Sequence, residues 1–306
     1  MTRASRLALI LALGASSAVA RQLRVPGDYS RIQAAIDAAR NGDDIVIAPG
    51  TYDEYGVDFK GKAIEVRASD ARPWQTVVRA DKRGSVFMFH SGEGDDSVLQ
   101  GLTITEGSSW AGAGIFIEGM AASPLIRNCT IVGNDADNYG GGIYVASSAP
   151  AITSCVIYDN TAVRGGGVYV GSIGYPDVTN CTIADNAASG RGGGINIYRG
   201  DPDIRNSIIW GNSPQALYND GGSSSVTYSD IQGGWSGEGN INEDPRFRGF
   251  RAYGYVLNVG SPCMDAGSDE ADALPWGEIH ARYGQFNSSK ADMGVYGGPN
   301  AGPWQK

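Results

Sequence analysis

The sequence predicts an all-β solenoid, a parallel β-helix in which short strands stack coil upon coil. Residues 124–212 contain one pattern written four times at a fixed step of 26 residues, and self-similarity at such a period is typical of repeat architectures. Within each repeat, short apolar alternations are bounded by Gly, Pro and Asn, which indicates strands and turns. None of the four repeats contains a helical pattern. We therefore expect each repeat to form one coil.

Equivalent residues of the repeats form columns. An isoleucine column is expected to stack inside as an aliphatic ladder. An asparagine column ends the same strand, where Asn tolerates left-handed backbone angles and stacked amides can hydrogen-bond from coil to coil. Glycine triplets precede the next strand, at a bend where side chains would crowd. The columns are Ile131, Ile157, Ile183 and Ile209; Asn134, Asn160, Asn186 and Asn212; and the triplets 140–142, 165–167 and 192–194.

Residues 1–20 have the pattern of a secretory signal. Arg3 and Arg6 precede an apolar stretch at 7–13, and small residues at 18–20 form a cleavage site. The apolar run is shorter than the roughly 20 residues that span a bilayer. We expect an exported protein, secreted or held in the periplasm or at the cell surface, without a transmembrane segment.

The composition restricts the partners of the protein. The formal net charge is −9 at pH 7, which argues against nucleic acid and anionic membranes as partners. With 45 glycines among 306 residues, the chain is rich in turns, and it is long enough to bury one elongated core. We expect a monomer.

A short helix is expected near the start of the mature chain. Ser30 can cap it, and Ile32, Ala35, Ile36 and Ala39 form one apolar face. A solenoid needs a cap over its first coil, and this helix is placed to provide it. The expected organisation is a signal at 1–20, an N-terminal cap at 21–42, the β-helix at 43–244 and a C-terminal cap at 245–306.

Two parts of the chain carry a family resemblance. Residues 32–37 followed by 49–52 resemble the opening of the pectin-lyase-like right-handed β-helix superfamily. With the repeats, this resemblance covers most of the mature chain and implies a right-handed parallel β-helix of about eight or nine coils. Residues 244–247, 261–267 and 292–298 are similar to the C-terminal region of exported bacterial β-helix proteins of the choice-of-anchor type, where this region closes the barrel.

Three of the four cysteines, Cys129, Cys155 and Cys181, occupy one inward column, and Cys263 lies outside it. An even count in an exported protein suggests disulfides. However, stacked side chains on parallel strands point the same way, which fits the geometry of a disulfide poorly. We therefore favour buried free thiols. The Cys and His spacings of zinc sites are absent from the sequence.

A stripe of residues is expected to point outward from the strand after the glycines. It comprises Phe116, Tyr144, Tyr169, Asn196 and Tyr218. Exposed apolar surface tends to mark a binding site, and flat rings can stack on the faces of sugars, so one interpretation is a linear polysaccharide lying along the stripe. The other is that these aromatics are good strand residues that stabilise each other across coils.

Arg164 and Arg191 occupy equivalent places in adjacent coils, just before the glycines. Superfamily members that cleave acidic polysaccharides by β-elimination neutralise a uronate carboxylate with Ca²⁺ and basic side chains. The resemblance therefore implies that these arginines form a carboxylate clamp. It implies that Tyr169 or Tyr144 acts as a base whose pKa the arginines lower. The catalytic signatures of pectate lyases, pectin methylesterases, polygalacturonases and alginate epimerases are absent.

Asp159 and Asp185 stand one coil apart beside the asparagine column. Stacked like charges are unfavourable unless something compensates them, and a Ca²⁺ ion, which takes several carboxylate oxygens, would do so. The other interpretation is that both are solvated turn residues.

Two functional hypotheses follow. The first is a carbohydrate-active enzyme, a lyase or epimerase acting on a uronic-acid polymer. The second is a non-catalytic exported protein that binds polysaccharide at the same stripe. The family resemblance favours the first, and the absent catalytic signatures favour the second.

Overall fold

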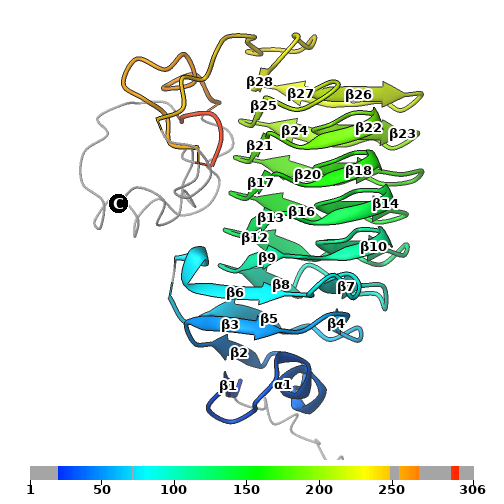
Figure 1. Cartoon of the computed structure of the whole chain (residues 1–306), viewed down its shortest axis with the longest axis vertical. Coiled ribbons are helices and arrows are strands. Elements are labelled where there is room, and N and C mark those ends of the chain that lie inside the picture. Colours follow the sequence, from blue (N-terminus) through cyan, green and yellow to red (C-terminus); the bar gives the residue numbers. More distant parts are fainter. Residues whose placement is uncertain (1–19, 71, 249–254, 269–290, 296–306) are drawn as a thin grey trace, which may run out of the picture.

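The structure, a computed structural model, describes residues 20–70, 72–248, 255–268 and 291–295, so most of the predicted signal lies outside the described residues. The chain winds into an elongated solenoid whose strands form four parallel sheets, with the helix α1 (Ile32–Ala38) at one end (Figure 1). The predicted fold class is confirmed. Among the described residues, none of the helices has the length and apolar character required to cross a bilayer.

Sheets A and B form two sides of the solenoid. Sheet A contains β1 (Gln22–Val25), β2 (Asp44–Ile47), β5 (Glu65–Ala68), β8 (Val98–Gln100), β12 (Leu125–Arg127), β16 (Ala151–Thr153), β20 (Asp177–Thr179), β24 (Asp203–Arg205) and β27 (Ser225–Thr227). Sheet B contains β3 (Gly50–Asp53), β6 (Thr76–Arg79), β9 (Thr103–Thr105), β13 (Thr130–Val132), β17 (Val156–Tyr158), β21 (Thr182–Ala184), β25 (Ile208–Trp210) and β28 (Asp230–Ile231).

Sheets C and D complete the circuit. Sheet C contains β4 (Val57–Asp58), β7 (Phe87–Phe89), β11 (Ile115–Glu118), β15 (Ile143–Ala146), β19 (Val168–Val170), β23 (Ile195–Tyr198) and β26 (Leu217–Asp220). Sheet D contains β10 (Ser108–Ala111), β14 (Asp135–Tyr139), β18 (Thr161–Arg164) and β22 (Ala187–Arg191). A coil of the repeat region visits sheets A, B, D and C in turn, and a 3-10 turn, η1 (Pro73–Gln75), precedes β6.

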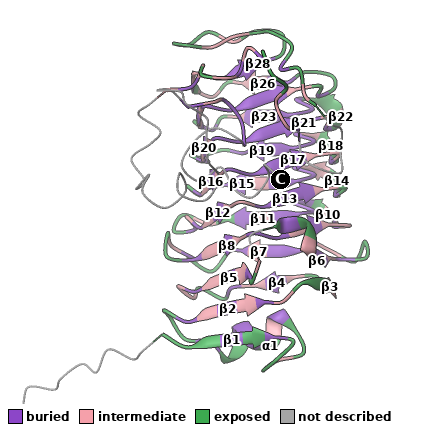
Figure 2. Ribbon diagram, turned by 90° about the vertical axis from the view of Figure 1, so that its left-hand side faces the viewer, coloured by how far each residue is buried: buried purple, intermediate pink, exposed green. Residues whose placement is uncertain are grey.

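The predicted ladders are present inside the solenoid. The isoleucine column is fully buried, and Figure 2 shows buried segments along the strands of the stacked coils. The side-chain amide of Asn134 donates to Asn160 (2.9 Å) and that of Asn160 to Asn186 (3.0 Å). The prediction that the ladder asparagines take left-handed angles is wrong. The residue before each one does so, as at Asp159 with φ of 51°, because the ladder amide must itself point into the core to reach the next coil.

The glycine triplets lie where the backbones of neighbouring coils approach closely. Gly165, the first of its triplet, has φ of +67°. A Cβ atom on the second, Gly166, would lie 2.4 Å from the carbonyl oxygen of Ala187 in the next coil. The crowding predicted for this bend is therefore confirmed. All four cysteines are buried free thiols, as expected.

Helix α1 covers the first coil with Ile32, Ala35 and Ile36, which are buried. The prediction that Ser30 caps it is wrong, because the N-cap residue is Arg31 and makes no side-chain capping bond. The buried carboxylate of Glu54, from the following coil, instead accepts hydrogen bonds from the backbone amides of Ile32 (2.6 Å) and Gln33 (3.1 Å). The segment expected to be only a cap, residues 21–42, also contains β1, which pairs with β2.

The described residues 255–268 and 291–295, which we name the C-terminal strap, lie beside the upper coils on the sheet B side (orange and red in Figure 1). Tyr255 and Val295 pack against Val156, and Met293 packs against Ile208. The expectation that residues 245–306 as a whole form a C-terminal cap stays a prediction, because much of this range lies outside the described residues. The strap covers the outward column of sheet B from the side, over Val156, Thr182 and Ile208. Trp235, just after β28, packs against the solenoid core.

Candidate functional site

The predicted stripe lies in one register on the outer face of sheet C. Phe116 pairs with Tyr144, and the pairing continues through Tyr169, Asn196 and Tyr218 in successive strands. The alignment of these five residues across coils is therefore confirmed. Whether the aligned rings are available to a ligand depends on how their side chains pack.

The prediction that the whole stripe is exposed is wrong. Tyr169 is 5% exposed and Asn196 is 2% exposed. The rings of Phe116 and Tyr144 are stacked with centroids 5.2 Å apart, and those of Tyr144 and Tyr169 with centroids 5.6 Å apart and an interplanar angle of 3°. Tyr139 from sheet D packs on Tyr169 as well. The ring faces are therefore occupied by other rings, which supports the interpretation that these aromatics stabilise each other across coils.

The same packing sets the acidity of the stacked tyrosines. Burial raises the pKa of Tyr169, neighbouring Tyr139 and Tyr144 raise it further, and the positive charge of Arg164 lowers it by less. Burial, followed by the charge of Glu118, also raises the pKa of Tyr144. The expectation of a tyrosine base with a lowered pKa is wrong, because loss of water around the ring outweighs the nearby guanidinium. A catalytic role for Tyr169 stays a prediction, and its raised pKa counts against it.

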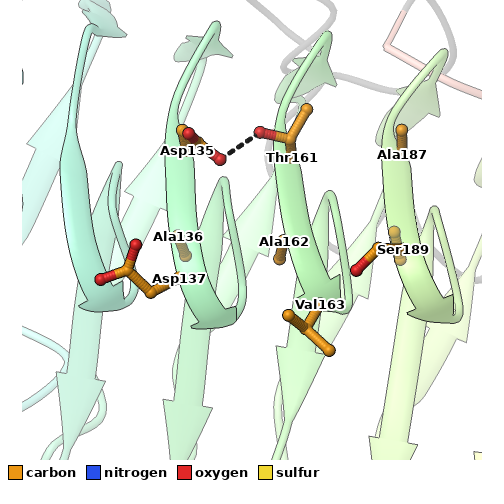
Figure 3. A pocket seen from close by; sticks show the side chains of 9 residues that line it. Asp135, Ala136, Asp137, Thr161, Ala162, Val163, Ala187 and Ser189 are labelled. Carbon is orange, nitrogen blue, oxygen red and sulfur yellow. Dashed lines mark hydrogen bonds between the residues drawn. The ribbon is translucent and has the colours of Figure 1, made fainter.

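A groove of about 490 Å³ lies on the outer face of sheet D (Figure 3). The small side chains of Ala136 and Ala162 are buried and pack with Ala113, which leaves the surface above them hollow. The hydroxyl of Thr161 donates to the Asp135 carboxylate across the groove. The lining residues come from β14, β18 and β22: Asp135, Ala136, Asp137, Thr161, Ala162, Val163, Ala187, Ala188 and Ser189.

The two predicted arginines end the strands that form this groove. Arg164 pairs with Tyr139 on one side and with Arg191 on the other, so the backbones of the two arginines lie in adjacent coils, about 4.8 Å apart along the axis. The guanidinium of Arg164 lies 5.9 Å from the ring centroid of Tyr139, and that of Arg191 lies 4.9 Å from the ring centroid of Tyr218. Arg191 lies 3.4 Å from the carboxylate of Asp220. In the described part of the chain, no carboxylate forms an ion pair with Arg164. Two neighbouring positive charges, one without an acidic partner there, favour an anionic ligand.

The arginines belong to a longer row that the sequence did not reveal. Trp110 in β10 is 60% exposed, and its ring meets Tyr139 edge-on with centroids 5.0 Å apart. One coil earlier Arg83 lies over the ring of Tyr55, 4.8 Å from its centroid. Each of these residues lies between the sheet B strand and the sheet C strand of its own coil. We name the set the aromatic–arginine row: Tyr55, Arg83, Trp110, Tyr139, Arg164 and Arg191.

Trp110 and Tyr55 were missed because they precede the regular repeats, which begin at residue 124. The coil of Trp110 keeps Gly112 and Gly114 at the glycine positions, but Gly107 takes the place of the ladder asparagine. The spacing between a sheet B strand and the next sheet C strand is the signal that could have found them, since it places both residues at the same corner of the solenoid.

Asp159 and Asp185 lie one coil apart in the turn from sheet B to sheet D, as predicted. The hydroxyl of Tyr255 in the C-terminal strap donates to the Asp185 carboxylate (3.0 Å), so the strap supplies part of the compensation that the stacked charges need. The described residues contain no group of three or more His, Cys, Asp or Glu side chains arranged to hold a metal ion. Ca²⁺ binding at this pair stays a prediction.

A family profile described as the right handed beta helix region matches residues 78–231, about half of the chain. The chain therefore belongs to the right-handed β-helix family. No curated protein matches the sequence. Among solved structures, the pectate lyase Pel9A has 15% identity and a TM-score of 0.50, covering 90% of this chain and 96% of that one. At this identity, the likeness concerns the fold alone.

Two pectin methylesterase structures overlap with this chain at lower TM-scores. The enzyme from the rice weevil has 15% identity and a TM-score of 0.38, with 68% of this chain and 76% of that chain covered. A mutant pectin methylesterase in complex with a hexasaccharide has 10% identity and a TM-score of 0.42, with 74% and 93% covered.

Proposed function

We propose that the protein binds an acidic polysaccharide that lies along the coil axis over sheet D. The observation that carries this proposal is the pair of arginines, Arg164 and Arg191, that end two adjacent strands of a groove crossing three coils. A carboxylate on a sugar ring would accept paired hydrogen bonds from such a guanidinium. It would also relieve the repulsion between the two arginines.

The spacing of the row suits a repeating polymer. Coils repeat about every 4.8 Å, which is close to the length of one sugar unit in an extended polysaccharide. Trp110, exposed beside the groove, offers an apolar ring to a sugar face, and the arginines offer charge to successive acidic groups. The alanine floor keeps the groove open for rings that lie flat.

Binding is favoured over cleavage. The shared fold with a pectate lyase is compatible with polysaccharide chemistry. However, the tyrosine expected to act as the base is buried with a raised pKa. We therefore place the lyase or epimerase hypothesis second. Export of the protein, which rests on the pattern of residues 1–20, belongs to the same proposal, because such polymers occur outside the cytoplasm.

The test is retention of the protein by pectate and alginate in affinity gel electrophoresis, with dextran as a neutral polymer. We expect retention by an acidic polymer and about a tenfold weaker affinity for each of Arg164→Gln and Arg191→Gln, since hydrogen bonds to charged groups contribute about 1.5 to 3 kcal/mol. Arg205→Gln is the matched control, because Arg205 lies on sheet A and pairs with Asp177.

Three outcomes contradict the proposal in different ways. Absence of retention by every polymer removes the binding function. Equal retention by dextran, or losses in Arg205→Gln as large as in the groove variants, removes sheet D as an acidic-polymer site. New ultraviolet absorbance from unsaturated chain ends, with or without Ca²⁺, would make the protein a lyase and restore the first hypothesis.

A further inference from the structure

The face of sheet B that the C-terminal strap covers ends on a carboxylate. Its outward column runs through Val156, Thr182 and Ile208, and the next residue in register is Asp230 of β28. The side chains of this column are buried, and Asp230 is 0% exposed. An aspartate therefore continues an otherwise largely apolar column and lies under the strap.

The groups around the Asp230 carboxylate neutralise it poorly. The thiol of Cys263 in the strap donates to one carboxylate oxygen (Sγ–Oδ2, 3.1 Å), and the backbone amide of Glu243 donates to the other (3.2 Å). A thiol is a weak donor. The charged groups that act on Asp230 are Glu243 and Asp244, and Asp292 acts on Cys263 from the second part of the strap. In the described residues, no Lys or Arg forms an ion pair with Asp230.

Several other contacts of the strap with the solenoid involve no ionisable group. The side chain of Asn206 bonds the backbone of Ser268 in both directions (3.1 and 2.8 Å). The amide of Gly294 donates to the Asn206 carbonyl oxygen (2.7 Å), and the amide of Val295 donates to the Thr182 hydroxyl (3.1 Å). These bonds and the apolar packing hold the strap over the same face both in acid and at neutral pH.

We propose that the C-terminal strap is a pH-sensitive latch on sheet B. The Asp230–Cys263 contact holds the strap closed in acid, and this contact weakens at neutral pH. When protonated, the buried carboxyl is neutral and can donate a hydrogen bond. When ionised, it is a buried charge with one amide and one weak donor. Releasing the strap returns this charge to water.

The direction of the effect follows from the protonation of Asp230. Burial raises its pKa from 3.8 to about 6, while the Cys263 thiol and the Glu243 amide lower it by less. Between these values the closed latch binds more protons than the open one, so closure is strongest below pH 4 and weakens as the pH rises to about 6. The two-unit difference corresponds to about a hundredfold change in the opening equilibrium. Asp292, whose pKa burial also raises, acts in the same direction.

The experiment is hydrogen exchange, followed by mass spectrometry on the full chain, of peptides from residues 255–268 between pH 4 and 8, corrected for intrinsic exchange. We expect protection of the strap to fall up to about a hundredfold across this range, while peptides of β15 stay protected. In Asp230→Asn the fall should shrink to the smaller part due to Asp292. Asp96→Asn, on an exposed loop, should behave like the wild type.

A second variant keeps the test decisive if Asp230→Asn fails to fold. Cys263→Ser replaces the thiol by a stronger donor, which should stabilise the ionised carboxylate and shift the midpoint of the profile to lower pH. A flat wild-type profile would overturn the latch, as would a fall in Asp230→Asn equal to that of the wild type. If Asp230→Asn does not fold, an unshifted midpoint in Cys263→Ser would have the same meaning.

Discussion

The outer face of sheet C and the corner formed by sheet D both carry aromatic residues, but they use them differently. On sheet C, Phe116, Tyr144 and Tyr169 follow one another in strict register, and their rings stack at 5.2 and 5.6 Å. On the sheet D side, Trp110 meets Tyr139 edge-on and keeps 60% of its surface exposed. Where aromatic residues follow one another in register, each ring covers the face of its neighbour. Where the row is interrupted, as at Trp110, much of the ring stays exposed to solvent.

The difference separates stability from binding. A regular aromatic ladder is the outer counterpart of the isoleucine ladder, because both gain from contact between adjacent coils. A row that mixes aromatic and positively charged residues gains less from such contact, and it leaves charge and the surface of Trp110 open to solvent. If this distinction is correct, substitutions on the two faces should affect different measurements.

The largest expected effect is on stability, from Tyr169→Ala in the sheet C stack. The substitution removes a buried ring that Tyr139 and Tyr144 contact, so we expect a loss of about 3 kcal/mol in the free energy of unfolding, typical of a buried aromatic replaced by Ala. Polysaccharide affinity at a temperature where the variant is folded should stay near the wild-type value. Urea denaturation followed by circular dichroism measures the loss.

Tyr175→Ala is the matched control for this prediction, because Tyr175 is exposed on the loop that leads to β20. Its cost should be within about 0.5 kcal/mol. Equal losses in the two variants would mean that the stack contributes nothing beyond an ordinary surface tyrosine. The comparison between the two faces would then fail.

The sequence predicted the solenoid because residues 26 positions apart occupy the same place in adjacent coils. Ile157 and Asn160 had to fall in columns for the coils to pair, and the structure places both inside. It did not predict the burial of Tyr169, since alternation places a side chain outside a sheet without telling what covers it. Here Tyr139, which arrives from sheet D through a bulged strand, covers the ring.

The sequence also did not indicate where the C-terminal strap lies. Tyr255 reaches Asp185 across 70 positions in sequence, and no periodicity connects them. Trp110 was missed for the converse reason, because it lies in a coil that does not follow the repeat. The sequence could predict what repeats, including the pair Arg164 and Arg191, whereas Trp110 and the C-terminal strap depart from the repeat and could not be placed.

An intermediate effect is expected for Trp110→Ala in the aromatic–arginine row. Because the ring is largely exposed, the free energy of unfolding should change by no more than about 0.5 kcal/mol. Affinity for the acidic polymer should fall about tenfold, or about 1.4 kcal/mol, as for an aromatic residue that contributes moderately to a binding free energy. Affinity gel electrophoresis measures it, and Trp74→Ala, in η1 beside sheet B, is the control. Similar losses in both variants would remove Trp110 from the site.

The smallest effect is expected for Tyr144→Phe, and it decides whether sheet C takes any part in binding. The ring, which stacks between Phe116 and Tyr169, is retained, so the free energy of unfolding should change by less than about 0.5 kcal/mol. Only the hydroxyl at the edge of the ring is lost, and if sheet C serves to hold coils together, polysaccharide affinity should not change. A clear loss of affinity with unchanged stability would mean that the polymer contacts the hydroxyl edges of the stack. The sheet C stack would then be a second wall of the binding site, even though its ring faces are closed to the ligand.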